Sequence, residues 1–157
     1  MKTMVHVANL GYSAKNYSLF KSINEVVENS LEEVSVVPLD MTNACVQLRT
    51  AIHQMPEMGS FGDGILLALS FKDAETILGC ANNAIKVLYI HDLDWMFEPI
   101  EYSRVYDILH NNQLKVIVRS EEYLEPLKKA FGFTPEGTTQ CNLEEIWTLL
   151  EEIKTES

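Results

Sequence analysis

Five short apolar runs, each followed by a segment with helical spacing, constrain the fold of this 157-residue chain more than any other feature. Two of the runs, residues 65–69 and 87–90, are apolar or aromatic at every position. This pattern is typical of strands that helices cover on both faces, as in a parallel sheet. The other three runs are residues 3–9, 34–37 and 114–118, and Pro38 is expected to end the strand at 34–37.

Segments with apolar residues three and four positions apart separate these runs. They predict helices at residues 17–29, 44–55, 72–83, 99–111, 121–131 and 143–154. Pro99 suits a first helical turn, Ser120 is a cap candidate for the helix at 121–131, and Gly132 is expected to end it. The alternation predicts one three-layer α-β-α domain over residues 1–157, Rossmann-like, with a mainly parallel five-stranded sheet in the order 2-1-3-4-5.

The amino-acid composition argues against several classes of function. With 23 acidic and 12 basic residues the net charge is −11, which argues against direct binding to nucleic acid. No apolar run approaches the roughly 20 residues of a membrane span, and the first residues lack a signal-peptide pattern. We therefore expect a cytoplasmic protein without a membrane span. Cys45, Cys80 and Cys141 are widely spaced, which argues against a disulfide framework or a zinc site.

The run at 87–90 ends in His91, Asp92 and Asp94, which we predict to be catalytic. Ligands of open α/β sheets bind beyond the carboxyl ends of the strands. A histidine there can accept a proton from an attacking hydroxyl, and Asp92 or Asp94 could orient its ring or hold it charged. A simple hydrogen bond to a neighbouring loop is an equal alternative for His91. A metal site would need a fourth ligand that is not evident, so we predict no metal and no cofactor.

The loop after the first strand supplies three predicted ligand-binding residues, Gly11, Ser13 and Lys15. A glycine lets backbone amides approach an anion at the start of the next helix. The loop matches neither the dinucleotide nor the P-loop fingerprint, and an ordinary turn between strand and helix is the favoured interpretation. Three further residues at predicted strand ends complete the predicted ligand-binding set: Ser70, Arg119 and Ser120.

From residue 63 onward the chain resembles the acceptor-side, N-terminal domain of retaining glycosyltransferases with two Rossmann domains (GT-B type, like glycosyltransferase family 4). An aspartate opens the apolar run at 63–67, a later strand ends in His91, and the strand at 116–118 runs into Ser120 and a helix. The resemblance implies that His91 corresponds to the active-site histidine of the family. It also implies that Gly11 and Ser120 line the cleft.

The chain departs from that family in lacking its donor-site basic residues and paired glutamates. The resemblance therefore implies a second glycosyltransferase domain or subunit as partner, which would hold the nucleotide sugar while this chain binds the sugar acceptor. A non-enzymatic, acidic interaction or regulatory protein on the same scaffold is the alternative. A flavodoxin-like binder of a phosphorylated ligand at residues 11–15 is the third hypothesis.

Overall fold

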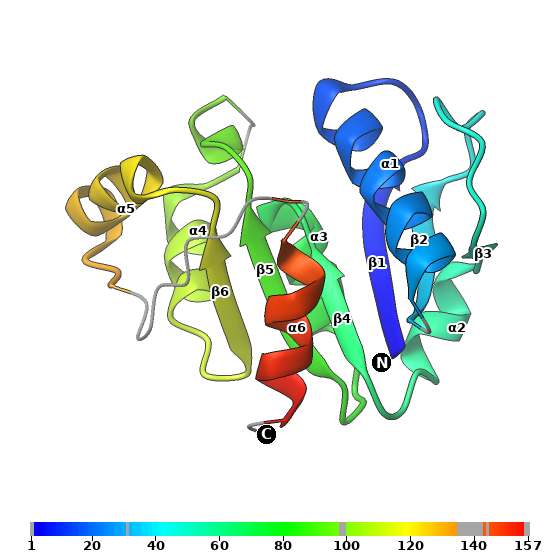
Figure 1. Ribbon diagram of the computed structural model, residues 1–157. Coiled ribbons are helices and arrows are strands. Elements are labelled where there is room, and N and C mark those ends of the chain that lie inside the picture. Colours follow the sequence, from blue (N-terminus) through cyan, green and yellow to red (C-terminus); the bar gives the residue numbers. More distant parts are fainter. Residues whose placement is uncertain (1, 31, 98–99, 135–142, 144, 156–157) are drawn as a thin grey trace.

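Six parallel strands form one sheet in the order β3-β2-β1-β4-β5-β6 (Figure 1). The computed structural model describes residues 2–30, 32–97, 100–134, 143 and 145–155. The strands are β1 Lys2–Asn9, β2 Glu33–Asp40, β3 Ala51–Ile52, β4 Ile65–Ala68, β5 Ile85–Ile90 and β6 Leu114–Val118. The helices are α1 Ala14–Asn29, α2 Met55–Gly59, α3 Phe71–Leu78, α4 Tyr102–Leu109, α5 Leu124–Phe131 and α6 Ile146–Thr155, with short 3-10 turns η1 Asp94–Met96 and η2 Glu121–Tyr123.

The three-layer α/β architecture predicted from the sequence is confirmed. Helices α1 and α6 cover one face of the sheet, and α2, α3, α4 and α5 cover the other (Figure 1). The four residues of β4 are completely buried between the two layers, which explains why that run is apolar throughout. The five predicted strands stand in the predicted order, and β3 is an additional edge strand beside β2.

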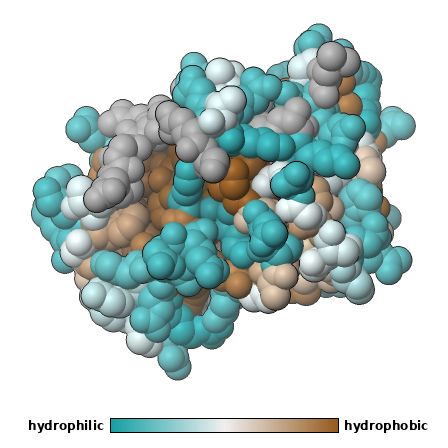
Figure 2. Space-filling view, turned by 90° about the horizontal axis from the view of Figure 1, so that it is seen from below, coloured by the Kyte–Doolittle hydropathy of each residue, from teal (hydrophilic) through white to brown (hydrophobic). Residues whose placement is uncertain are grey.

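The face drawn in Figure 2 carries many hydrophilic side chains, in keeping with the net charge of −11. Figure 2 views the molecule from below Figure 1, that is, from the amino ends of the strands. An apolar area is visible in the left half of that view, on the side where β6 and α5 lie in Figure 1.

The prediction of a helix at residues 44–55 is wrong. Residues 41–50 are irregular, and β3 and the five-residue α2 follow. Polar groups of this segment form hydrogen bonds with distant parts of the chain instead of with each other. The Thr42 hydroxyl accepts from the Leu10 amide (3.0 Å), and the Arg49 amide donates to the Asn24 side chain (2.8 Å). The apolar spacing of this segment reflects packing against the β1 loop and α1, not helical periodicity.

The strand predicted to stop at Pro38 continues to Asp40. The carbonyl of Val36 accepts from the His53 amide at 2.8 Å, so Val36 points its hydrogen-bonding groups toward β3. Strand alternation turns Pro38 the same way, toward an edge that β3 no longer covers. The missing N–H of the proline therefore leaves no partner unsatisfied.

Several helix boundaries differ from the predicted ones. Helix α3 ends at Leu78, where the Gly79 amide bonds back to Glu75 (3.1 Å), rather than at residue 83. Helix α5 ends at Gly132 in the left-handed conformation (φ 62°), as predicted. Pro99 and the part of the predicted loop at residues 135–141 lie outside the described residues.

The turn before β4 requires glycine at position 64. Gly64 has φ 154°, and an added Cβ would lie 2.6 Å from the Lys2 carbonyl oxygen and 2.7 Å from the Phe61 ring. We expect Gly64→Ala to lower the free energy of unfolding by about 1–3 kcal/mol, measured by urea denaturation. Gly62→Ala is the matched control, because open space surrounds that position, and it should change stability by less than about 0.5 kcal/mol. Equal effects at both positions would contradict this account.

Candidate functional site at the carboxyl edge of the sheet

The candidate site lies where the chain reverses its direction across the sheet. From β1 the chain moves outward to β2 and β3, then returns to β4 on the other side of β1. The loops that follow β1 and β4 therefore diverge at this point, which is where open α/β sheets bind ligands. The loop after β5 lies at the same end of the molecule, at the top of Figure 1. Three of the segments named from the sequence thus lie along one edge.

An ion pair links these three segments. Lys15 lies in the first turn of α1, and its Nζ is 2.6 Å from Asp94 Oδ2 and 3.2 Å from the carbonyl oxygen of Leu69. Only 23% of the lysine side chain and 15% of the aspartate side chain are exposed. The predicted ligand-binding Lys15 and the predicted catalytic Asp94 are therefore partners. Their opposite charges largely cancel within a sheltered contact.

The second oxygen of Asp94 has no hydrogen-bond donor among the described residues. Asp94 Oδ1 is buried, although a buried carboxylate oxygen normally accepts a hydrogen bond. Next to it is a crevice of about 10 Å³, bordered by Ser70, Tyr89, Asp92 and Asp94 among others. That volume is close to the least that holds a water molecule, about 10–15 Å³. The edge thus presents a sheltered acceptor and room for one small donor group.

His91 stands at the end of β5 with 15% of its side chain exposed. Burial lowers its pKa below the ordinary value near 6.5, and the positive charges of Arg119 and Lys15 lower it further. Asp92 opposes this shift through a long contact of 3.4 Å between its Oδ2 and His91 Nδ1. Of the two predicted roles for Asp92, a weak orienting contact fits these values better than holding the ring charged. His91 is therefore neutral at pH 7 and able to accept a proton.

The loop after β1 is closed by its own hydrogen bonds. The Gly11 amide donates to the Asn9 side chain and the Asn16 amide donates to the Ser13 hydroxyl, both at 2.9 Å. The Asn16 side chain donates in turn to the Gly11 carbonyl, also at 2.9 Å. These bonds account for Gly11 and Ser13 as parts of an ordinary turn with an N-cap. Ligand binding by these two residues stays a prediction.

The remaining predicted ligand-binding residues have different surroundings. Ser70 caps α3 by accepting from the Asp73 amide (3.1 Å), and it also borders the crevice beside Asp94. The backbone amide of Arg119 donates to the Ile90 carbonyl (3.0 Å), which places its charge near His91. Ser120 occupies the N-cap position of η2 without a side-chain capping bond. Ser70 therefore lies at the site and Arg119 acts on it through its charge. The Ser120 carbonyl accepts from the Tyr123 amide (3.2 Å), a contact within η2.

A buried pair at this edge was not predicted. His6 Nδ1 lies 2.8 Å from the Val37 carbonyl oxygen, and its Nε2 lies 3.8 Å from Asp73 Oδ1. Burial raises the pKa of Asp73, against the lowering effects of the Ser70 hydroxyl and of nearby positive charges. Since the Nδ1 proton goes to Val37, the facing atoms of the pair are both acceptors unless one of them takes a proton. The spacing of Ser70 and Asp73 in the sequence is that of a capping box, which could have indicated the position of Asp73 at the start of α3.

Comparison of the chain with models of protein families, with curated proteins and with solved structures finds no match. The resemblance to glycosyltransferases therefore stays a prediction. In the described part of the chain, no three His, Cys, Asp or Glu side chains are grouped to hold a metal ion. None of the helices in the described ranges has the length and apolar character needed to cross a membrane. Cys45 and Cys80 are free thiols, and Cys141 lies outside the described residues.

We expect the His91 imidazole to titrate below pH 6.5 in an NMR titration. Asp92→Asn should lower that pKa further, because it removes the opposing negative charge, and Arg119→Gln should raise it. Since folding favours the neutral ring, the free energy of unfolding should fall as the pH drops from about 6.5 through the pKa of the folded state. A pKa above the ordinary value, a rise of the pKa in Asp92→Asn, or a fall in Arg119→Gln would contradict this electrostatic account.

The pair formed by Lys15 and Asp94 should couple strongly in a double-mutant cycle. Lys15→Met leaves a sheltered carboxylate without its cation and should cost about 2 kcal/mol of stability, whereas adding Asp94→Asn should recover part of that loss. Lys21→Met on the same helix is the control, because Lys21 and its partner Glu25 are both more than half exposed. That variant should change stability by less than about 0.5 kcal/mol. Additive effects at Lys15 and Asp94 would show that their contact is energetically silent.

Proposed function

We propose that the carboxyl edge binds a small hydroxyl-bearing molecule and that His91 accepts the proton of one of its hydroxyl groups. Asp94 Oδ1 carries this proposal, because a buried acceptor that has no donor among the described residues and borders a crevice is suited to a ligand O–H. The lysine on its other oxygen favours the ionised carboxylate. Asp94 is thus assigned a binding role and His91 the role of general base.

The tautomer of His91 supports this division of roles. A proton on Nδ1 can point toward Asp92, the contact at 3.4 Å, and this leaves the Nε2 lone pair free to accept. A neutral imidazole that takes a proton from a hydroxyl increases the nucleophilicity of the oxygen. Burial that disfavours the charged ring limits how long the proton stays on His91. The site therefore suits transfer of a group to a ligand hydroxyl.

We further propose that the chain is the acceptor-side half of a glycosyltransferase-like assembly. Large apolar side chains are exposed at the end of β2, on the loops that follow β1, β2 and β5, and at the start of α1, all at the same end of the molecule in Figure 1. They are Tyr12, Tyr17, Leu39, Met41, Met96 and Phe97. Such a rim is costly in water and favours closure by another polypeptide. A second domain or subunit seated there would hold the sugar nucleotide.

The same rim keeps a non-enzymatic alternative open. An acidic protein could use these side chains to bind a basic partner without any chemistry at His91. A pull-down that recovers one stoichiometric basic protein, equally with the wild type and with His91→Ala, favours this alternative. The phosphate-binding hypothesis has less support, because the amides of Gly11 and Asn16 are already bonded within the loop.

The direct test is an amide NMR titration with methyl α-glucoside and myo-inositol as hydroxyl-bearing probes. We expect shifts at Ser70, His91 and Asp94, and about tenfold or greater weakening in Asp94→Asn, because a hydrogen bond to a charged group is worth about 1.5–3 kcal/mol. Asp107→Asn, an exposed change of equal charge on α4, should bind like the wild type. Absence of these shifts, or equal weakening in both variants, would refute the proposed site.

A further inference from the structure

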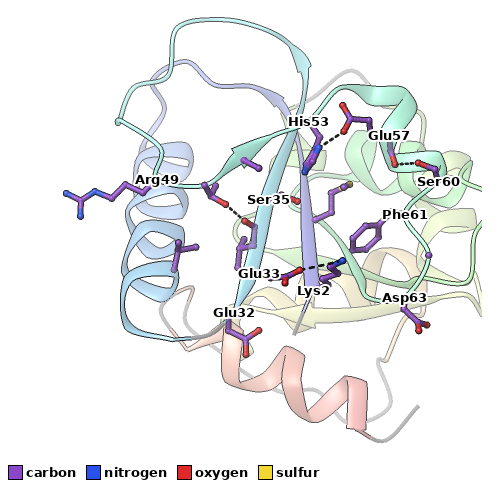
Figure 3. Close-up of a pocket in the computed structure, with 16 residues that line it drawn as sticks. Lys2, Glu32, Glu33, Ser35, Arg49, His53, Glu57, Ser60, Phe61 and Asp63 are labelled. Carbon is purple, nitrogen blue, oxygen red and sulfur yellow. Dashed lines mark hydrogen bonds and ion pairs between the residues drawn. The ribbon is translucent and has the colours of Figure 1, made fainter.

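We propose that the opposite, amino edge of the sheet holds a second binding site, for a small organic amine with an aromatic or apolar body. A hollow of about 740 Å³ lies at the amino ends of β1, β2 and β3 (Figure 3). Its size falls within the range of about 300–1,000 Å³ that is usual for small-molecule sites. It exists because β3 has two residues and α2 has five, so this corner of the sheet lacks a full-length covering helix.

The interior surface of the hollow is apolar and preformed. Met4 lines it from β1 and the Phe61 ring lines it from the loop after α2, on the same face of the sheet. The ring lies against the tight turn at Gly64, where an added Cβ would meet it at 2.7 Å. An apolar ligand body could pack against Met4 and Phe61 without rearrangement of the backbone. A fixed aromatic face also attracts cations.

Hydrogen-bond acceptors dominate the polar part of the lining. His53 Nδ1 lies 2.5 Å from Glu57 Oε2, and Glu57 Oε1 accepts from the Gln54 amide at 3.0 Å. These contacts lower the pKa of Glu57, so it remains a carboxylate that holds the Nδ1 proton of the imidazole. In the neutral imidazole the other ring nitrogen of His53 is an acceptor. The hydroxyl of Ser35, from the middle of the lining in Figure 3, adds another.

The charges around the hollow favour a cation. The lining contains the carboxylates Glu33, Glu57 and Asp63 against the two cations Lys2 and Arg49, and a fourth carboxylate, Glu32, has Glu151 and Lys154 as neighbours outside the lining. Both cations already have carboxylate partners, because Lys2 pairs with Glu33 at 3.5 Å and Arg49 pairs with Glu28. Figure 3 shows the Arg49 side chain pointing away from the hollow. An ammonium group near Glu33, with its apolar body on Phe61, matches this arrangement better than an anion does.

The test uses phenethylamine and 3-phenylpropionate, which share an aryl-alkyl body and differ in the sign of their charge. In amide NMR titrations of the full chain at pH 7, phenethylamine should shift Ser35, His53 and Phe61. Its affinity should exceed that of the anion by about tenfold or more. Glu33→Gln and Phe61→Leu should each weaken binding about threefold or more, while the remote Asp107→Asn should not.

Three outcomes would overturn the proposal: no shifts at these residues, equal affinity for the two probes, or equal weakening by Glu33→Gln and Asp107→Asn. Equal weakening by the two variants would mean that the net charge of the protein alone attracts the amine. Phe61→Leu keeps an apolar side chain at a partly buried position, and Glu33 is exposed, so neither variant tests folding instead of binding. The residues scored here are distinct from those scored at the carboxyl edge, so either proposal can fail alone.

Discussion

Burial of β4 on both faces is the constraint on which the rest of the structure depends. Its four residues are inaccessible to water, so each face of the sheet needs its own layer of helices. With β4 next to β1, the chain must cross from the far edge at β3 back to the middle of the sheet. That crossing creates the divergence of loops at the carboxyl edge. The burial of an apolar strand thus decides where polar chemistry can collect.

The five main strands could be predicted because their signal is local. Continuous apolar runs at 65–69 and 87–90 allow few structures other than central parallel strands, and the helices between them follow from spacing alone. The edge strand β3 was harder to predict, because it has only two residues and is defined by its pairing with Ser35 and Val36. The incorrect prediction of a helix at residues 44–55 has the same cause, which is that contacts distant in sequence decide the local structure. Its apolar side chains face α1 and β1, elements far away in sequence.

The candidate site was predictable in its location but not in its pairings. Strand ends identify His91 and Asp94, since the carboxyl ends of parallel strands share one edge. No sequence pattern shows that Lys15 reaches across 79 positions to Asp94, or that the other carboxylate oxygen has no donor in the described part of the chain. The pair formed by His6 and Asp73 was missed for a similar reason. A lone histidine in an apolar strand does not reveal which carboxylate will be folded against it.

The two edges of the sheet differ in what limits their chemistry. At the carboxyl edge, Lys15 neutralises Asp94, and the positive charges of Lys15 and Arg119 favour a neutral His91, so the polar groups suit an uncharged hydroxyl ligand. At the amino edge the cations are already paired, and the excess of carboxylates suits a positively charged ligand. A net charge of −11 is therefore compatible with two different recognition tasks. Local pairing, rather than the total charge, decides which ligand each edge can accept.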